Sequence, residues 1–450
     1  MKQSIAARWG GFVGWAERAD PLRLVILGYL SYVLIGWALL CLPVCQQSPG
    51  ATPLDHLFMA TSAMSTTGLT TVSTADSYTF WGELVILLLI QAGGLGYMSI
   101  GSFVMLSLSG RLPTVHHRVS STALSLPAGF DLRHFLRLMI LFTLAIEAAG
   151  ALALYLGVFR PHGAPQPAWQ AVFHSVSAFC TAGFGLFNDS FESYRGDIWL
   201  NLILIALSYL GAIGFIVVSD VWHSWRHRHA RVTLTSKIIL LSTLCISVLG
   251  TVLFFLDEPT VQALPVGERW LASWFQVMTA STTVGFNTVP IGGLSASSLF
   301  LLVIVMMIGA SPSGTGGGIK TTTFTALWAV MAAVVQRRSE PVFMGREIPE
   351  PRVRGAVAGF LFYCLTLAAG VYALALVETA PLADQMFECA SALGTVGLSR
   401  GLTGALSACG KVVIILLMFL GRVGPIAMGM AFFRSGPDRS HENPEEDVAI

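Results

Sequence analysis

Four short segments of the sequence share residues that could bind a monovalent cation. They are FMATSAMSTTGL (58–69), FHSVSAFCTAGF (173–184), FQVMTASTTVGF (275–286) and FECASALGTVGL (387–398), and all follow the pattern F-x3-[ST]-A-x2-T-x-G-[LF]. Glycine accepts positive φ, so the carbonyl groups beside it can turn toward a common axis. A ring of such carbonyls can replace the hydration shell of a monovalent cation.

The pattern predicts which residues form this ring. Each segment contributes its threonine, its glycine and the residue between them, so the predicted selectivity filter consists of Thr66, Thr67, Gly68, Thr181, Ala182, Gly183, Thr283, Val284, Gly285, Thr395, Val396 and Gly397. The alternative is that the glycines are helix caps and the threonines satisfy local backbone groups. One such segment would fit that alternative, but four in register favour a shared ring.

The elements around these segments are apolar. Of 450 residues, 54% are hydrophobic and only 11% are charged, with a mean hydropathy of +0.69. Soluble globular chains carry roughly a quarter charged residues, so the composition indicates a polytopic membrane protein. Runs long enough to cross a bilayer occur near 22–44, 80–108, 135–159, 197–222, 236–256, 297–335, 354–378 and 409–433.

One patterned segment falls between the two spans of each successive pair. We therefore expect an all-α membrane protein with eight transmembrane helices in four pseudo-symmetric helix–pore loop–helix repeats around one central pore. The half-helix before each glycine turn would direct its negative C-terminal end toward the pore and favour a cation there. The expected divisions are an N-terminus (1–21), repeat 1 (22–108), repeat 2 (133–222), repeat 3 (235–335), repeat 4 (354–434) and a tail (435–450).

The distribution of charge predicts the orientation. Most of the 26 Lys and Arg residues fall in the termini and in the loops after the second, fourth and sixth spans. The opposite side, which carries the four patterned segments, has five basic residues and an excess of acidic ones. By the positive-inside rule, both termini are cytoplasmic and the patterned segments face outward. The expected location is the plasma membrane, in bacteria the inner membrane.

The sixth span is interrupted by IGASPSGTGGGIKTTT (308–323), which cannot form a continuous helix. Non-helical backbone at this depth requires protein or a water-filled cavity around it. We expect residues 309–320 to lie under the filter as a gate; a static kink that packs against another helix is the alternative. The predicted gate residues are Gly309, Gly314, Gly316, Gly317, Gly318, Lys320 and Arg422 of the eighth span.

With these motifs, the sequence resembles the Ktr/Trk/HKT superfamily of cation transporters over nearly its whole length, and most closely the Ktr membrane subunit. The resemblance implies potassium selectivity, because members with serine at the first filter glycine tend to favour sodium and this chain has Gly68. It implies an intramembrane gating loop, and it places Arg422 near the pore below the filter, where the charge would oppose cation passage. A structural role for Arg422, bonding carbonyls near Gly424 and Pro425, is the alternative.

The resemblance also implies partners. They are a second copy of the chain in a homodimer, each copy keeping its own pore, and a cytoplasmic ring of RCK-type nucleotide-binding subunits. The predicted function is therefore potassium uptake, with K+ as the transported ion. Sodium transport or sodium–potassium coupling is the alternative, and a secondary transporter of an organic solute is a more remote one. We expect neither an enzyme nor a nucleic-acid-binding protein, and no organic cofactor in this chain.

Overall fold

The computed structural model describes residues 21–48, 50–96, 132–226 and 232–424. Regular structure in this part of the chain is helical, apart from a hairpin of β1 (Val342–Phe343) and β2 (Arg346–Glu347). The predicted C-terminal tail, most of the predicted N-terminus and the C-terminal ends of the spans predicted at 80–108 and 409–433 lie outside the described residues. The mostly helical class is confirmed.

The helices follow one order four times: a longer helix, a short buried helix, a turn and a further helix. The four sets are α2 (Pro21–Leu40), α3 (Pro53–Met64) and α5 (Phe80–Leu95); α8 (Leu132–Leu154), α9 (Pro167–Phe179) and α10 (Ile198–Ile213); α12 (Leu234–Asp257), α14 (Val266–Thr282) and α15 (Ala296–Met307); and α17 (Glu350–Val377), α18 (Leu382–Gly394) and α19 (Ala408–Val423). The remaining helices are α4 (Thr74–Ser77), α11 (Phe215–Arg226), α13 (Pro259–Gln262) and α16 (Thr321–Val335).

The short helices α3, α9, α14 and α18 carry the patterned segments. Each begins at a proline or directly after one, where the missing N–H and the fixed φ of proline suit a helix start. The invariant phenylalanines and alanines of the pattern are almost fully buried: Phe58, Phe173, Phe275, Phe387, Ala63, Ala178, Ala280 and Ala392. The repeated pattern is therefore partly a packing pattern that seats these helices in the core.

Two predicted spans differ from the observed helices. The span predicted at 197–222 is two helices, α10 and α11, bent by 90° at Gly214, whose φ of +92° belongs to the left-handed side of backbone space. The span predicted at 297–335 is broken between α15 and α16, as its glycine-rich interruption implies. The residues on both sides of Gly214 are apolar, so hydropathy alone did not indicate the bend.

Length and composition identify four described helices as able to cross a membrane: residues 23–40, 136–159, 234–257 and 350–377. The bent pair α10–α11 would be a fifth, and α5, α15 and α16 are shorter apolar helices. The protein is thus a multi-pass membrane protein, and the number of eight spans stays a prediction.

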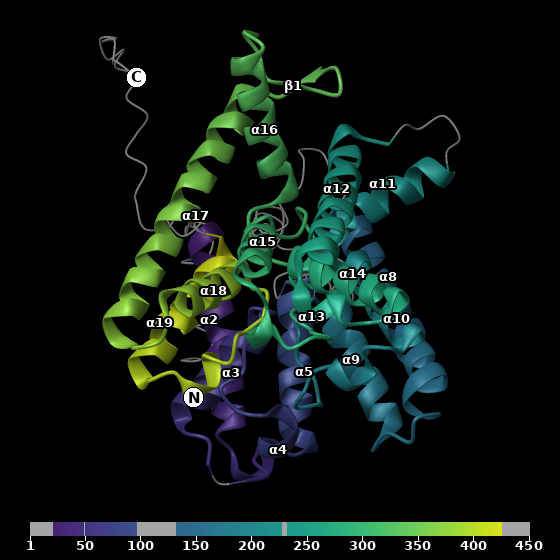
Figure 1. Cartoon of the computed structure of the whole chain (residues 1–450), viewed down its shortest axis with the longest axis vertical. Helices are drawn as coiled ribbons and strands as arrows, with labels where there is room; N and C mark the ends of the chain where they lie inside the picture. The colour runs from purple at the N-terminus through teal and green to yellow at the C-terminus, as the bar shows by residue number, and fades with distance from the viewer. Residues whose placement is uncertain (1–20, 49, 97–131, 227–231, 425–450) are drawn as a thin grey trace, which may run out of the picture.

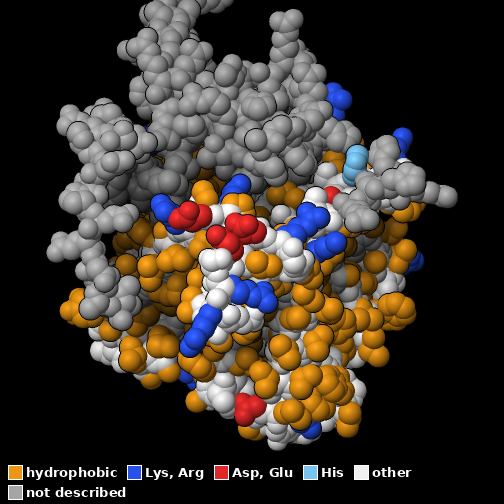
Figure 2. Space-filling model, turned by 90° about the horizontal axis from the view of Figure 1, so that it is seen from above, with side chains coloured by type: hydrophobic (Ala, Val, Ile, Leu, Met, Phe, Trp, Pro, Cys, Tyr) orange, Lys and Arg blue, Asp and Glu red, His pale blue; other side chains and the backbone are white. Residues whose placement is uncertain are grey.

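One end of the molecule projects beyond the bundle. Figure 1 shows α16 and the start of α17 extending together past the other helices, with the β1–β2 hairpin at the tip. Figure 2 looks onto this end, where Lys, Arg, Asp and Glu side chains gather while hydrophobic side chains cover the flanks. The charged end surrounded by apolar flanks is the pattern expected of a surface that emerges from a bilayer.

Candidate functional site

The four Thr-x-Gly turns have the same backbone geometry. The threonines Thr66, Thr181, Thr283 and Thr395 all have positive φ, between 50° and 61°. The glycines that follow also have positive φ, from 68° to 96°. Left-handed backbone is rare for a β-branched residue such as threonine and persists only when the surroundings impose it. Four such turns in one chain indicate a shared structural requirement.

Each turn is closed by a hydrogen bond inside its own repeat. The N–H of the residue after the threonine donates to the carbonyl of the residue four positions after the invariant phenylalanine. The four bonds are Thr67 to Ser62, Ala182 to Ser177, Val284 to Thr279 and Val396 to Ser391, with lengths of 2.8–3.1 Å. In two repeats the serine hydroxyl also accepts from the filter glycine, Gly68 at 3.1 Å and Gly397 at 3.0 Å. The acceptor of this bond lies four residues after the phenylalanine and its donor one residue before the glycine. The spacing of the sequence pattern therefore places both groups of the bond.

The four turns contact one another in a closed ring. A side-chain carbon placed on Gly68 would lie 2.6 Å from the carbonyl oxygen of Ala182. In the same way Gly183 faces the carbonyl of Val284, Gly285 that of Val396, and Gly397 that of Thr67. The structure thus brings together the predicted residues of all four segments, and only glycine fits between the neighbouring carbonyls.

A cavity of about 620 Å³ lies on one side of the ring and includes all four glycines in its wall. The polar residues around it include Asn188, Asp189, Glu192 and Arg400. Burial raises the pKa of Glu192 and nearby Asp189 adds to this rise, while Asn287 and Arg195 oppose it. This cavity therefore has carboxylates at its rim and the glycine ring at its base.

Residues 309–320 lie on the threonine side of the ring. Thr315 is the central contact: its Oγ1 donates to the Phe179 carbonyl at 3.1 Å and lies 3.1 Å from Thr181 Oγ1, and its carbonyl accepts from Thr66 Oγ1 at 3.3 Å. The N–H of Gly317 donates to Thr283 Oγ1 at 3.3 Å. Gly317 also packs against the fourth threonine, because a side-chain carbon on Gly317 would collide with Thr395 Oγ1. The loop therefore contacts the filter threonine of every repeat.

The same loop is bound to the bend between α10 and α11. The N–H groups of Ser311 and Thr315 donate to the carbonyls of Ala212 and Gly211, both at 3.1 Å. In the other direction, Phe215 N–H donates to the Ser313 carbonyl at 3.3 Å, and Ile216 N–H donates to Ser313 Oγ at 3.1 Å. We call residues 211–216 the elbow. The sequence analysis did not identify the elbow, which holds the loop with four hydrogen bonds.

A glycine pair could have revealed the elbow. Gly93 and Gly96, Gly211 and Gly214, and Gly421 and Gly424 share one spacing near the ends of α5, α10 and α19. The first glycine of each pair packs on the carbonyl near the end of the short helix in its repeat, and the second has positive φ. In the third repeat, Met306 stands at the first position and the glycine-rich loop begins at the second, Gly309.

Arg422 and Lys320 bond to carbonyls around the loop. Arg422 donates from its two terminal nitrogens to the carbonyls of Thr315 and Gly93. The alternative role for Arg422 was a bond to carbonyls near Gly424 and Pro425, and the observed partners differ from these. Pro425 itself lies outside the described residues. Lys320 Nζ donates to the Gly316 carbonyl at 2.7 Å, within its own loop. Arg422 therefore ties the loop to the first and fourth repeats.

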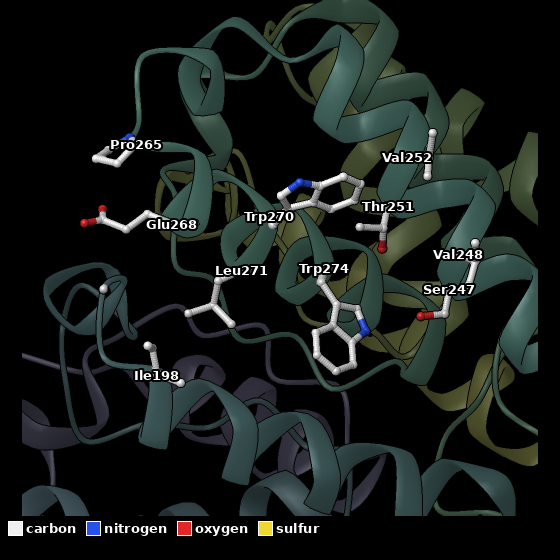
Figure 3. A pocket seen from close by; sticks show the side chains of 12 residues that line it. Ile198, Ser247, Val248, Thr251, Val252, Pro265, Glu268, Trp270, Leu271 and Trp274 are labelled. Atoms are coloured by element: carbon white, nitrogen blue, oxygen red, sulfur yellow. The ribbon is translucent and has the colours of Figure 1, made fainter.

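Two further features lie away from the axis. Glu147, for which the sequence suggested no partner, accepts from Gln91 Nε2 at 3.2 Å and contacts Cys180 Sγ at 3.6 Å. A cavity of about 810 Å³ opens between α10, α12 and α14 and is lined by Trp270, Leu271 and Trp274. Figure 3 shows Trp270 pointing toward Thr251, while Leu271 points toward Ile198. None of the four glycine turns lines this second cavity, so it is separate from the ring.

Comparisons with known proteins support a transport role. The family model described as "TrkH: Cation transport protein" matches residues 38–441. The chain is 35% identical over 432 residues to Ktr system potassium uptake protein B of Vibrio alginolyticus, covering 94% of this chain and 93% of that protein. It is 32% identical over 444 residues to potassium/sodium uptake protein NtpJ of Enterococcus hirae, covering 96% and 98%. The crystal structure of the potassium transporter TrkH from Vibrio parahaemolyticus has a TM-score of 0.72 at 19% identity, over 92% of this chain and 85% of that chain, and shows the shared fold.

Proposed function

Because the chain belongs to the TrkH family of cation transport proteins, we propose that it takes up potassium through the ring of four Thr-x-Gly turns. The family consists of transporters, so the chain is not an enzyme. The observation that carries the proposal is the closed contact of Gly68, Gly183, Gly285 and Gly397 with the carbonyls of their neighbours. Those carbonyls are the uncharged oxygen donors that a dehydrated monovalent cation requires.

The ring belongs to a four-repeat pore in this proposal. The repeats are 22–108, 133–222, 235–335 and 354–434, with eight spans and both termini in the cytoplasm of a bacterial cell. The recurring helix order supports the repeats. The charged end in Figure 2 supports the orientation, because it contains the loop between α16 and α17 with Arg337, Arg338 and Arg346.

Residues 309–320 act as the gate of this pore, with Lys320 and Arg422 at its edge. The support is their position: the loop contacts the threonines on the inner side of the ring, and Arg422 bonds to the loop at Thr315. A cation leaving the ring toward the cytoplasm would meet this loop. Transport thus requires the loop to move aside, as in a hinged closure. We further propose a homodimer and an RCK-type cytoplasmic subunit as the source of regulation.

Potassium is the proposed ion, and sodium or both ions together is the second candidate. Two relatives carry names that differ on this point, potassium uptake protein B and potassium/sodium uptake protein NtpJ. Glycine at all four filter positions favours potassium, since a side chain at any of them would push into a ring carbonyl.

The test is uptake of potassium against sodium into proteoliposomes by the wild type and by Gly285→Ser. Gly285 has a φ of +86° and faces the Val396 carbonyl, so serine should distort the ring and reduce the preference for potassium by about tenfold or more, as an energy of 1.4 kcal/mol would. Gly293→Ser is the matched control, because nothing lies within 4 Å of a side-chain carbon there. Equal uptake of both ions by the wild type would contradict a selective filter.

A further inference from the structure

The residue after each invariant phenylalanine forms a second set of equivalent positions. They hold Met59, His174, Gln276 and Glu388, and all four side chains are buried with at most 2% exposure. The last three are polar, and each reaches the segment that follows the filter glycine of its own repeat. A polar group buried at such a depth needs a partner, so these contacts show what the position does.

In the second and third repeats the position supports the backbone beyond the filter. His174 Nδ1 bonds to the Gln170 carbonyl at 2.9 Å, so Nε2 is the acceptor for the Leu186 N–H at 3.1 Å. Gln276 Oε1 accepts from the Thr288 N–H at 3.2 Å. Both N–H groups belong to the third residue after the filter glycine. These two side chains are neutral braces of the outer segment.

Glu388 differs because it brings a carboxylate to the same place. It accepts from Ser399 Oγ at 2.9 Å and from Thr403 Oγ1. In the described part of the chain no Lys or Arg forms an ion pair with it; the neighbouring Arg400 pairs with Asp384. Ser399 and Thr403 line the outer cavity together with Gly397. The carboxylate is therefore one side chain behind the cavity wall.

A buried carboxyl group without a basic partner is either protonated or kept charged by another positive charge nearby. The ring and the outer cavity are where the proposed function places a cation. We propose that Glu388 sets the cation affinity of the filter: its negative charge is balanced by the transported cation and raises cation occupancy at the outer end of the ring. This inference rests on the proposed potassium uptake.

The third repeat offers a matched variant. Among the described residues Gln276 Nε2 has no hydrogen-bond partner, whereas its Oε1 accepts from the Thr288 N–H. Gln276→Glu therefore keeps the bonded oxygen and replaces an unpaired donor by a second oxygen. It adds a carboxylate at the position equivalent to Glu388 without removing a contact. Variants at Glu388 and Gln276 can therefore distinguish the effect of the carboxylate charge from the effect of a lost hydrogen bond.

The experiment measures the apparent KM and maximal rate of rubidium uptake into proteoliposomes at one fixed pH. We expect Glu388→Gln to raise KM on the order of tenfold, the scale of one charge acting through an effective dielectric of about 20, with a smaller change in maximal rate. Glu388→Asp should restore part of the affinity. Glu388→Gln combined with Gln276→Glu should also recover affinity, which a merely structural role for Glu388 does not predict.

Unchanged KM in a stable Glu388→Gln protein would overturn the inference, as would failure of the double variant to recover affinity. If Glu388→Gln does not fold, Gln276→Glu alone decides: KM should fall several-fold below that of the wild type, and an unchanged or raised KM contradicts the proposal. A wild type without rubidium uptake in the same vesicles would instead contradict the proposed function itself.

Discussion

The filter turns and the loop beneath them are both rich in glycine, but their hydrogen bonds come from different parts of the chain. Each filter turn is closed by an N–H and a carbonyl five residues apart in its own repeat, as between Thr67 and Ser62. The loop at 309–320 takes most of its partners from other repeats: Thr66, Thr181, the elbow and Arg422. Local sequence thus fixes the filter, whereas the arrangement of neighbouring repeats fixes the loop.

Under the proposed function, this difference separates selectivity from gating. A turn closed within one repeat keeps its shape when helices shift relative to one another. A loop held by several repeats depends on the position of each one. A shift of one repeat breaks its bonds to the loop and weakens the contacts of the loop with the other repeats. We therefore expect changes in the turns to alter which ion passes. Changes at the loop contacts should alter how much passes.

The largest effect is expected from shortening the loop. Deletion of residues 316–318 removes the Gly317 contacts with Thr283 and with Ala310. Each hydrogen bond contributes about 1 kcal/mol, so losing both should shift the closed state toward open by more than tenfold. We expect potassium flux into proteoliposomes to rise accordingly, with the potassium preference kept. Unchanged or lower flux in a deletion that elutes as a single well-folded species would show that the loop is a static kink.

Arg422→Ala should give the next largest effect. Arg422 donates to carbonyls of two other segments, at Thr315 in the loop and at Gly93. Of these two bonds, only the one to Thr315 restrains the loop; at about 1.5 kcal/mol, the lower end of the range for hydrogen bonds to charged groups, its loss should raise flux about tenfold. Arg422→Lys is the informative partner because lysine keeps the charge but lacks the planar fork that reaches both carbonyls. Flux near wild type in the lysine variant would assign the effect to charge, and flux near alanine would assign it to the bonds. A change in expression alone, with normal flux per molecule, would contradict both.

The same difference explains what the sequence could and could not predict. The ring of four Thr-x-Gly turns was predictable because its constraint is a short spacing repeated four times, from Phe58 to Gly68 and its equivalents. The elbow was not, since Gly214 lies in an apolar run and its partners Pro312 and Ser313 are about a hundred positions away. The bonds of Arg422 to Thr315 and Gly93 were missed for the same reason. The partners in contacts between repeats cannot be read from a periodic pattern in one chain. The recurring glycine pairs indicate only where in each repeat the helix end bends.

At the elbow, Gly214→Ala should have a smaller effect than either change in the gate. Gly214 has a φ of +92°, and a side-chain carbon there would lie 2.5 Å from the Pro312 carbonyl and 3.0 Å from Gly314 N. Alanine should push the loop away from the elbow and raise flux by a factor of about 2 to 5, the scale of losing one neutral hydrogen bond of about 0.5–1 kcal/mol. Gly163→Ala is a matched control, because Gly163 has a φ of +67° but nothing within 4 Å. Equal effects of the two variants on flux would assign the result to backbone strain and not to the loop contact.

The smallest effect on transport is expected from Glu192, which lines the outer cavity on the side of the ring away from the loop. Its raised pKa means that the carboxylate is neutralised at a higher pH than an ordinary glutamate, so its attraction for cations is present at high pH and is lost as pH falls through that pKa. Glu192→Gln should raise the apparent KM at neutral pH about twofold, as expected for one exposed charge. It should also remove part of the rise in KM that we expect of the wild type at acid pH. Glu268→Gln is the control, because Glu268 lines the separate cavity between α10, α12 and α14. If both variants keep the wild-type pH profile, the rim carboxylate does not act on cations, and control of occupancy lies deeper, at the ring itself.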